Sequence, residues 1–277
     1  MNPNCQNLPD FRREPCRQFV FTHRPDLRHT LGVAPTSPGN SPEAPIMRID
    51  INADLGEGCG WDDALLERVT SASISCGAHA GTPAEIIRTL RRATARGVVI
   101  GAHPGYRDRD GFGRREHDLP DAEIARQVVV QLDELAGWSA QVGATIRFVK
   151  PHGALYNQAQ RDARIAAAVV AGVRGWDLPL LGQPGSEVER AAELAGVRFV
   201  AEGFVDRRYL ADGRLMPRTE PGAVLSDQGE IRAQVLALAG RGIETLCVHG
   251  DNAHSVVLAD LARLTLQEAG FAVRGFI

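Results

Sequence analysis

The sequence predicts an α/β barrel, a closed ring of parallel strands surrounded by helices. Three observations predict this fold. Short β-rich runs alternate with helical stretches from Met47 onward, polar side chains gather where the β-rich runs end, and seven or eight such units fit into about 230 residues. Each unit is expected to connect parallel strands through a right-handed crossover. That many units favour a barrel over an open sheet.

Seven runs have the composition of strands. They span 48–52, 71–76, 98–101, 145–150, 178–182, 197–201 and 245–249. Helical patterns lie between them. Thr82, Pro83 and Glu85 form a capping box with proline at the first helical position, and Gly97 ends that helix. A second helix begins after Pro120, and further helices are expected at about 160–174, 186–195, 228–241 and 255–269.

The first 46 residues differ from the rest of the chain. They hold 8 of the 16 prolines and end in PTSPGNSPEAP, which is typical of a solvated, unpacked segment. We interpret 1–46 as a disordered tail or as a mis-called start, with Met47 as the real start. Residues 47–277 are expected to form a single (β/α) barrel that is the catalytic domain.

The composition excludes several classes of function. The net charge of −3 gives no electrostatic case for binding nucleic acid. No run approaches the roughly 20 apolar residues that a membrane span needs, so no membrane partner is expected. The five cysteines contain no CxxC pair and indicate neither a disulfide framework nor a structural zinc site. We therefore expect a cytoplasmic protein.

Lys150 is the only lysine among the 31 basic residues, and all the others are arginine. A single lysine against that bias indicates a role that arginine cannot fill, such as a compact donor or a titratable amine. A phosphate-binding P-loop requires Gly-Lys-Ser/Thr, but this lysine lies between Val149 and Pro151. If the protein uses a nucleotide, it does so without a P-loop.

Polar side chains cluster at the predicted carboxyl ends of the strands, which share one face in parallel α/β proteins. A lone histidine there is usually structural, but four histidines with several acidic groups indicate an active site. Cys76, also at a strand end, is interpreted as a buried structural thiol. The candidate catalytic residues are Asp54, Glu57, His79, His103, Lys150, His152 and Asp251. The candidate substrate-binding residues are Asn52, Arg114, Arg115, Arg207 and His249.

These residue types suit hydrolysis of an amide or ester by either of two routes. Asp54, His79 and His103 could hold a divalent metal that activates water and polarises a carbonyl. The same groups could instead act without a metal, as general base and acid. Lys150 could then stabilise an oxyanion or bind a phosphate. No dinucleotide fingerprint is present, so redox chemistry is not expected.

Six motifs in one order resemble the LamB/YcsF family. They are INADLGEG, SCGAHAG, IGAHPGYRDRDGFGRR, VKPHGALYN, EGFVDRRYLADGRL followed by PGAVL, and LCVHGD. The resemblance runs from Met47 to at least Asp251. The chain departs from the family pattern at Ala53, where the family usually has cysteine, so a mechanism with that cysteine as nucleophile would be disabled here.

The resemblance implies a distorted seven-stranded parallel (β/α) barrel similar to the glycoside hydrolase/deacetylase fold. It implies the A subunit of an ATP-dependent 5-oxoprolinase, which opens the lactam of 5-oxo-L-proline (pyroglutamate) to L-glutamate with ATP as co-substrate, Mg²⁺ accompanying the ATP, and B and C subunits as partners. Two alternatives stay open. One is a stand-alone metal-dependent deacetylase or amide hydrolase, and the other is a non-catalytic lactam-binding subunit.

Within that function we assign hypothetical roles to the candidate residues. Asp54, His79, His103 and His152 form the inner set that binds metal or activates water. Lys150 holds the developing oxyanion or a phosphoryl group. Arg114, Arg115 and Arg207 are candidates for the substrate carboxylate, and Glu57 and Asp251 are second choices as base.

Overall fold

The computed structural model describes residues 47–277. The interpretation of 1–46 as a disordered tail or mis-called start concerns residues outside this range. Among the described residues no helix combines the length and apolar character needed to cross a membrane.

Strands and helices alternate along the described chain. The strands are β1 (Arg48–Leu55), β2 (Ser71–Ser75), β3 (Val99–His103), β4 (Ile146–Val149), β5 (Leu180–Gly182), β6 (Phe199–Phe204), β7 (Thr245–Val248) and β8 (Ala272–Val273). The helices are α1 (Asp62–Leu66), α2 (Pro83–Ala95), α3 (Asp121–Ala140), α4 (Gly153–Arg161), α5 (Ala163–Val173), α6 (Glu187–Ala195), α7 (Gln228–Ala239) and α8 (Ser255–Glu268), and the short 3-10 helix η2 (Arg174–Trp176) follows α5.

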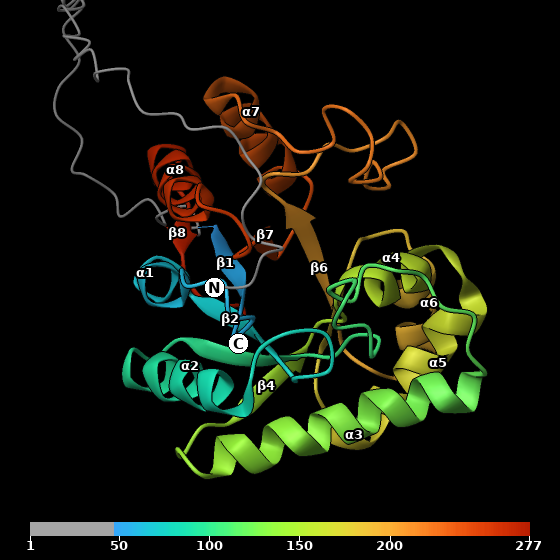
Figure 1. Ribbon diagram of the computed structural model, residues 1–277. Helices are drawn as coiled ribbons and strands as arrows, with labels where there is room; N and C mark the ends of the chain where they lie inside the picture. Colours follow the sequence, from blue (N-terminus) through green and yellow to red (C-terminus); the bar gives the residue numbers. More distant parts are fainter. Residues whose placement is uncertain (1–46) are drawn as a thin grey trace, which may run out of the picture. The chain divides into compact units, whose positions relative to one another are not determined.

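Seven of the strands form a closed parallel barrel. The strand order is β2-β3-β4-β5-β6-β7-β1, and β1 also pairs with β2, which closes the ring. The short β8 pairs with the first residues of β1, outside the ring. The helices surround the strands, and α3 lies along one side of the barrel below β4 in the view of Figure 1. The predicted seven-stranded (β/α) barrel is confirmed.

Alternation along β1 separates the site from the core. Asn52 and Asp54 contact Lys150 inside the barrel, whereas Ile51 and Ala53 belong to the apolar core. Successive side chains of a strand point to opposite faces. A cysteine at position 53 would therefore face the core and not the catalytic face, so Ala53 removes nothing from the site.

The observed elements differ from the expected ones in a few places. The helix expected at about 160–174 is α5, which the Asp162 side chain caps by accepting hydrogen bonds from the backbone N–H groups of Arg164 and Ile165, and the preceding α4 was not expected. Strand β6 starts and ends later than expected. The short α1 and β8 were not expected.

Candidate active site

Five of the predicted site residues come from the carboxyl ends of four strands. Asp54 is on β1, His103 ends β3, Lys150 and His152 follow β4, and His249 follows β7. All five line a cavity of about 680 Å³. The long segment between β6 and α7 also lines it and carries arginines toward it. The cavity is therefore at the face where α/β barrels place their chemistry.

Lys150 is buried, and its ammonium group is surrounded by acceptors. Its Nζ lies 2.9 Å from Asp54 Oδ1, 2.8 Å from Glu202 Oε1, 3.1 Å from Asn52 Oδ1 and 3.0 Å from Cys247 Sγ. These atoms come from β1, β6 and β7, so the lysine ties one side of the barrel to another. A compact ammonium with three donors suits such a site, and a planar guanidinium does not.

The charges around Lys150 fix its protonation. Burial alone would lower the pKa of Lys150, but Asp54, then Cys247 and Glu202, raise it well above its usual value. Burial likewise opposes ionisation of Asp54, yet Lys150 and His103 hold the pKa of Asp54 well below its usual range. Burial raises the pKa of Cys247, which stays a thiol. Lys150 is therefore a hydrogen-bond donor and not a base or nucleophile.

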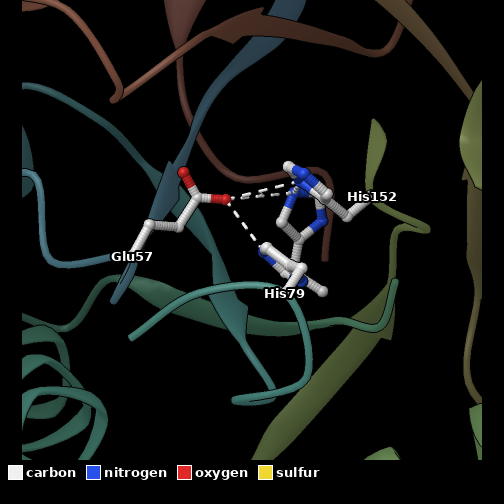
Figure 2. Close-up of side chains that lie close together, drawn as sticks. Glu57, His79 and His152 are labelled. Carbon is white, nitrogen blue, oxygen red and sulfur yellow. Dashed lines mark hydrogen bonds and ion pairs between the residues drawn. The ribbon is translucent and has the colours of Figure 1, made fainter. Parts of the chain in front are cut away.

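A second centre joins Glu57 to three histidines, and Figure 2 shows Glu57, His79 and His152 of this centre. Glu57 Oε1 lies 3.1 Å from His79 Nε2, 3.4 Å from His152 Nδ1 and 3.9 Å from His103 Nε2. The rings of His79 and His152 stack with centroids 3.8 Å apart. All four side chains are buried. Burial lowers the pKa of His79 and His152 and raises that of Glu57, so the neutral rings are favoured.

Backbone carbonyl groups determine which nitrogen of two rings carries hydrogen. His103 Nδ1 lies 2.7 Å from the Lys150 carbonyl oxygen, and His152 Nε2 lies 2.8 Å from that of Phe112. A carbonyl oxygen only accepts, so each of these nitrogens is the N–H donor. The remaining nitrogens, His103 Nε2 and His152 Nδ1, then carry lone pairs. These two lone pairs face each other across 3.0 Å.

Two facing lone pairs repel unless a proton or a cation lies between them. Glu57 brings an acceptor to the same point, and its oxygen and the three ring nitrogens lie within 4.8 Å of one another. Outward N–H groups held by carbonyl oxygens are also the pattern that orients metal-binding histidines. The donor set of three imidazoles and one carboxylate therefore fits a divalent transition metal such as Zn²⁺.

The metal set expected from the sequence was Asp54, His79 and His103. The structure groups the two histidines with Glu57 and His152 instead. Asp54 lies 3.5 Å from His103 Nε2 but pairs mainly with Lys150.

Gly113 lets the loop after β3 close over the histidines. Its φ is +65°, and a Cβ there would lie 2.8 Å from both His152 Cδ2 and His79 Cβ. A side chain at this position would therefore collide with both histidine side chains. Gly113 belongs to one of the six motifs, but nothing in the sequence indicates its contact with the histidines.

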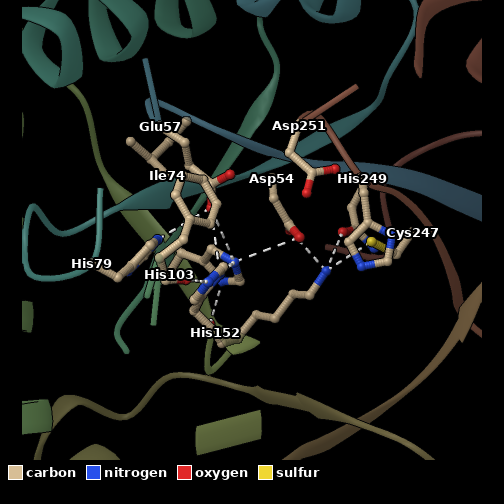
Figure 3. Close-up of polar contacts among 12 residues, drawn as sticks. Asp54, Glu57, Ile74, His79, His103, His152, Cys247, His249 and Asp251 are labelled. Carbon is tan, nitrogen blue, oxygen red and sulfur yellow. Dashed lines mark hydrogen bonds and ion pairs between the residues drawn. The ribbon is translucent and has the colours of Figure 1, made fainter. Parts of the chain in front are cut away.

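His249 belongs to a third group of side chains at the cavity. Its Nδ1 lies 2.8 Å and 3.1 Å from the two carboxylate oxygens of Asp206, and its ring stacks on Phe204 at 5.3 Å. Figure 3 shows His249 and Cys247 on one side of Asp54, with the Glu57 and histidine centre on the other. Asp54 therefore lies between His249 and the centre of Glu57 and three histidines.

Asp251 links two arginines at the edge of the cavity. It pairs with Arg114 and lies 3.1 Å from Arg218. Burial would raise the pKa of Asp251, but the guanidinium groups of Arg218 and Arg114 outweigh burial and lower this pKa. This carboxylate suits an anchoring role better than that of a base. Arg207 also lines the cavity, and its buried Nε has no hydrogen-bond partner among residues 47–277.

Two predicted substrate-binding residues do not line the cavity. Asn52 is fully buried below Lys150, where its Nδ2 donates to Glu202 and Thr245. Arg115 is exposed and pairs with Asp108. Asn52 is one strand layer deeper than Asp54, which explains its position. Cys76 is buried in the apolar core, as expected of a structural thiol.

Several residues of the site were not among the candidates. Glu202 and Asp206 both lie in the EGFVDRR motif, from which only Arg207 was chosen. Glu202 lies on β6 and Asp206 follows its end, so the carboxyl end of this strand was the signal that could have found both. Arg218 lies in the segment after β6 and has no local signal that marks it.

Comparison with known proteins agrees with this geometry. Residues 49–277 match the LamB/YcsF family. The chain belongs to the LamB/YcsF family. The resemblance predicted from the motifs is therefore confirmed.

Two relatives in the LamB/YcsF family are each 45% identical to this chain. One, from Paracidovorax citrulli, is named as the A subunit of 5-oxoprolinase, and the match covers 83% of this chain and 100% of the relative. The other, from Streptomyces coelicolor, has the same name, with 82% and 99% covered. The crystal structure of a lactam utilization protein from Thermus thermophilus is 38% identical and covers 83% of this chain and 100% of its own, with a TM-score of 0.76.

Proposed function

We propose that this chain is the A subunit of an ATP-dependent 5-oxoprolinase, which opens the lactam of 5-oxo-L-proline to L-glutamate together with B and C subunits. The names of its LamB/YcsF relatives support the assignment. The observation that supports this function most strongly is the position of Lys150, whose ammonium group lies beside Asp54 at the wall of the cavity. It lies next to a centre of carboxylate and imidazole groups that can activate water.

The cavity offers a partner for each polar group of a cyclic amide acid. Lys150 faces the lactam oxygen, or a phosphoryl group on it, because it is a fixed cation at the wall. Arg207 is the candidate for the substrate carboxylate, because its buried Nε has no other partner among the described residues. His249 lies near the lactam nitrogen in this arrangement.

The chemistry explains the use of ATP. A five-membered lactam is a stable amide, and transfer of a phosphoryl group to its oxygen creates a better electrophile. One water adds to that carbon, the C–N bond breaks, and an acyl phosphate forms. A second water releases phosphate and leaves glutamate. The balance is one lactam, one ATP and two waters to one glutamate, one ADP and one phosphate.

Glu57 and the three histidines are the groups that hold the attacking water and take up its proton. A divalent metal bound by these residues would lower the pKa of that water and polarise the carbon–oxygen bond. Asp54 links this centre to Lys150, since it contacts both His103 and the ammonium. Asp54 thus connects the group that acts on the lactam oxygen, Lys150, with the centre that supplies the attacking water.

Release of glutamate and ADP from 5-oxo-L-proline tests the proposal, with the chain alone and co-expressed with B and C subunits, with and without ATP. We expect turnover only in the complete mixture. The Lys150→Arg and Lys150→Met variants should each lose about 100-fold or more in rate, because neither restores a compact buried cation.

Other outcomes would contradict the proposal. Turnover by the lone chain without ATP, lost with a chelator, would favour a stand-alone metal-dependent hydrolase. Lactam binding with full complex activity in the Lys150→Met variant would favour a non-catalytic lactam-binding subunit. Circular dichroism melting of each variant separates loss of activity from loss of fold.

A further inference from the structure

His249 and Asp206 form a hydrogen-bonded pair at the cavity, and the proposed reaction gives this pair no chemical step. Asp206 is 1% exposed and faces His249 Nδ1 with both oxygens. A carboxylate only accepts, so Nδ1 carries the hydrogen. The other nitrogen, Nε2, has no hydrogen-bond partner among residues 47–277. Asp206 thus fixes the ring so that Nε2 remains available for a substrate.

The position of the ring is also fixed. His249 lines the cavity and stacks on Phe204, with an angle of 20° between the rings. Lys150 Nζ lies 5.3 Å from the centre of the same Phe204 ring. A ring nitrogen of His249 lies within 4.8 Å of an Asp54 oxygen. The lysine and the histidine therefore approach the same small volume, one suited to oxygen and the other to nitrogen.

The chemistry of ring opening contains a branch point. After water adds to the phosphorylated lactam, one carbon carries a hydroxyl, a phosphoryl oxygen and the ring nitrogen. Phosphate can leave without a proton. The hydroxyl then loses its proton, the lactam re-forms, and ATP has been hydrolysed without product.

Nitrogen leaves only when it is protonated. The electron pair of the C–N bond then passes to nitrogen, the hydroxyl loses its proton, and the acyl phosphate forms. The proton on nitrogen therefore decides between ring opening and futile hydrolysis of ATP.

We propose that His249, positioned by Asp206, delivers this proton and so sets how much glutamate is formed for each ATP consumed. This inference rests on the proposed function. His249 is the catalytic acid and Asp206 is a positioning residue. Burial lowers the pKa of His249, although Asp206 opposes that shift, so the protonated ring is a stronger acid than a free imidazolium and gives up its proton readily.

The experiment compares the wild-type complex with complexes that carry His249→Ala or Asp206→Asn, in ¹⁸O-labelled water with ATP and 5-oxo-L-proline. Glutamate, ADP and the ¹⁸O content of the remaining lactam are measured. We expect about one glutamate per ADP in the wild type and a ratio about tenfold lower in His249→Ala. Asp206→Asn should lie between them.

The label identifies the reason for the loss. If phosphate leaves from the intermediate, the oxygen of the added water stays on carbon, so unreacted 5-oxo-L-proline should gain ¹⁸O in the variants. Asp260→Asn is the matched control, because Asp260 lies on α8 and pairs with Arg68 at the surface. This variant should keep the wild-type ratio of glutamate to ADP.

Two results would overturn the inference. One is a glutamate-to-ADP ratio that stays at the wild-type value in both variants. The other is a parallel loss of glutamate and ADP with no ¹⁸O in the lactam, in variants that melt like the wild type. A wild-type complex that forms neither glutamate nor ADP would refute the proposed function instead.

Discussion

Lys150 illustrates at the scale of one side chain how composition can point to chemistry. In a chain that otherwise uses only arginine as its long cation, one lysine occurs, and it lies among four acceptor atoms in the barrel. Its position was predictable because it stands out in the sequence. Its partners Glu202 and Cys247 were not, because they become neighbours only when the barrel closes and their strands are far apart in sequence.

The Glu57 and histidine centre gives a prediction about metal binding. Purified protein is expected to bind about one Zn²⁺ per chain, measured by titration calorimetry and by elemental analysis after dialysis. Glu57→Gln and His152→Ala should each weaken binding about tenfold or more, because each removes one atom of the donor set.

Glu268→Gln is the matched control for this measurement. Glu268 is exposed and pairs with Arg232 on the surface, so its variant should bind Zn²⁺ like the wild type. Equal affinity in all four proteins would show that the facing nitrogens share a proton and not a metal ion.

At the scale of elements, all seven strands of the barrel were predicted, whereas the helices α1 and α4 were not. The seven β-rich runs were visible because buried parallel strands are short and apolar, and the glycine-rich motifs mark where they end. The helix α4 was missed because it begins at Gly153, directly after His152, with no side-chain cap. Asp206 lay inside a quoted motif, but its pairing with His249 depends on β6 and β7 being neighbours.

Helix α2 offers a prediction that separates stability from activity. Thr82 accepts a hydrogen bond from the Glu85 backbone and Glu85 returns one, so the predicted capping box is confirmed. Thr82→Ala should lower the free energy of unfolding by about 1 kcal/mol. The melting temperature should fall by about 2–4 °C.

The activity of the Thr82→Ala variant in the complex should be unchanged, because this helix start does not line the cavity. Thermal melting and glutamate release measured on the same preparation check both parts. An unchanged melting temperature would show that the box contributes nothing, and a large loss of turnover would show that α2 supports the site.

At the scale of the whole molecule, the barrel interior near β1 is polar. Toward the amino end of β1, Asp50 accepts hydrogen bonds from Thr70, Ser71 and Thr245. Lys150 and Asp54 lie at the other end of the barrel interior, at the cavity. The apolar core lies between the strands and the surrounding helices. Hydrophobic patterns could predict that core, but the polar layers inside the ring depend on closure of the barrel.

Asp50 predicts a dependence of stability on pH. Burial raises its pKa to about 6, against 3.8 in an unfolded chain, although the three hydroxyl groups oppose the shift. The folded state thus favours the protonated form. The contribution of this group is fully present below about pH 4 and is lost as the pH rises to about 6, by an amount on the order of 3 kcal/mol.

The Asp50→Asn variant tests this dependence by urea unfolding at several values between pH 4 and pH 7. Its stability relative to the wild type should improve as the pH rises through this window and then level off, because an amide carries no charge to bury. A difference that stays constant across the window would contradict the raised pKa.

The burial of Lys150 has a practical consequence for chemistry in solution. It is the only side-chain amine in the chain, and it is 2% exposed. Reagents that acylate amines will therefore leave it unmodified while the barrel is closed, and will add one label to it when β1, β4, β6 and β7 separate. Mass spectrometry of such labelling would report opening of the barrel through a single native atom, without any introduced probe.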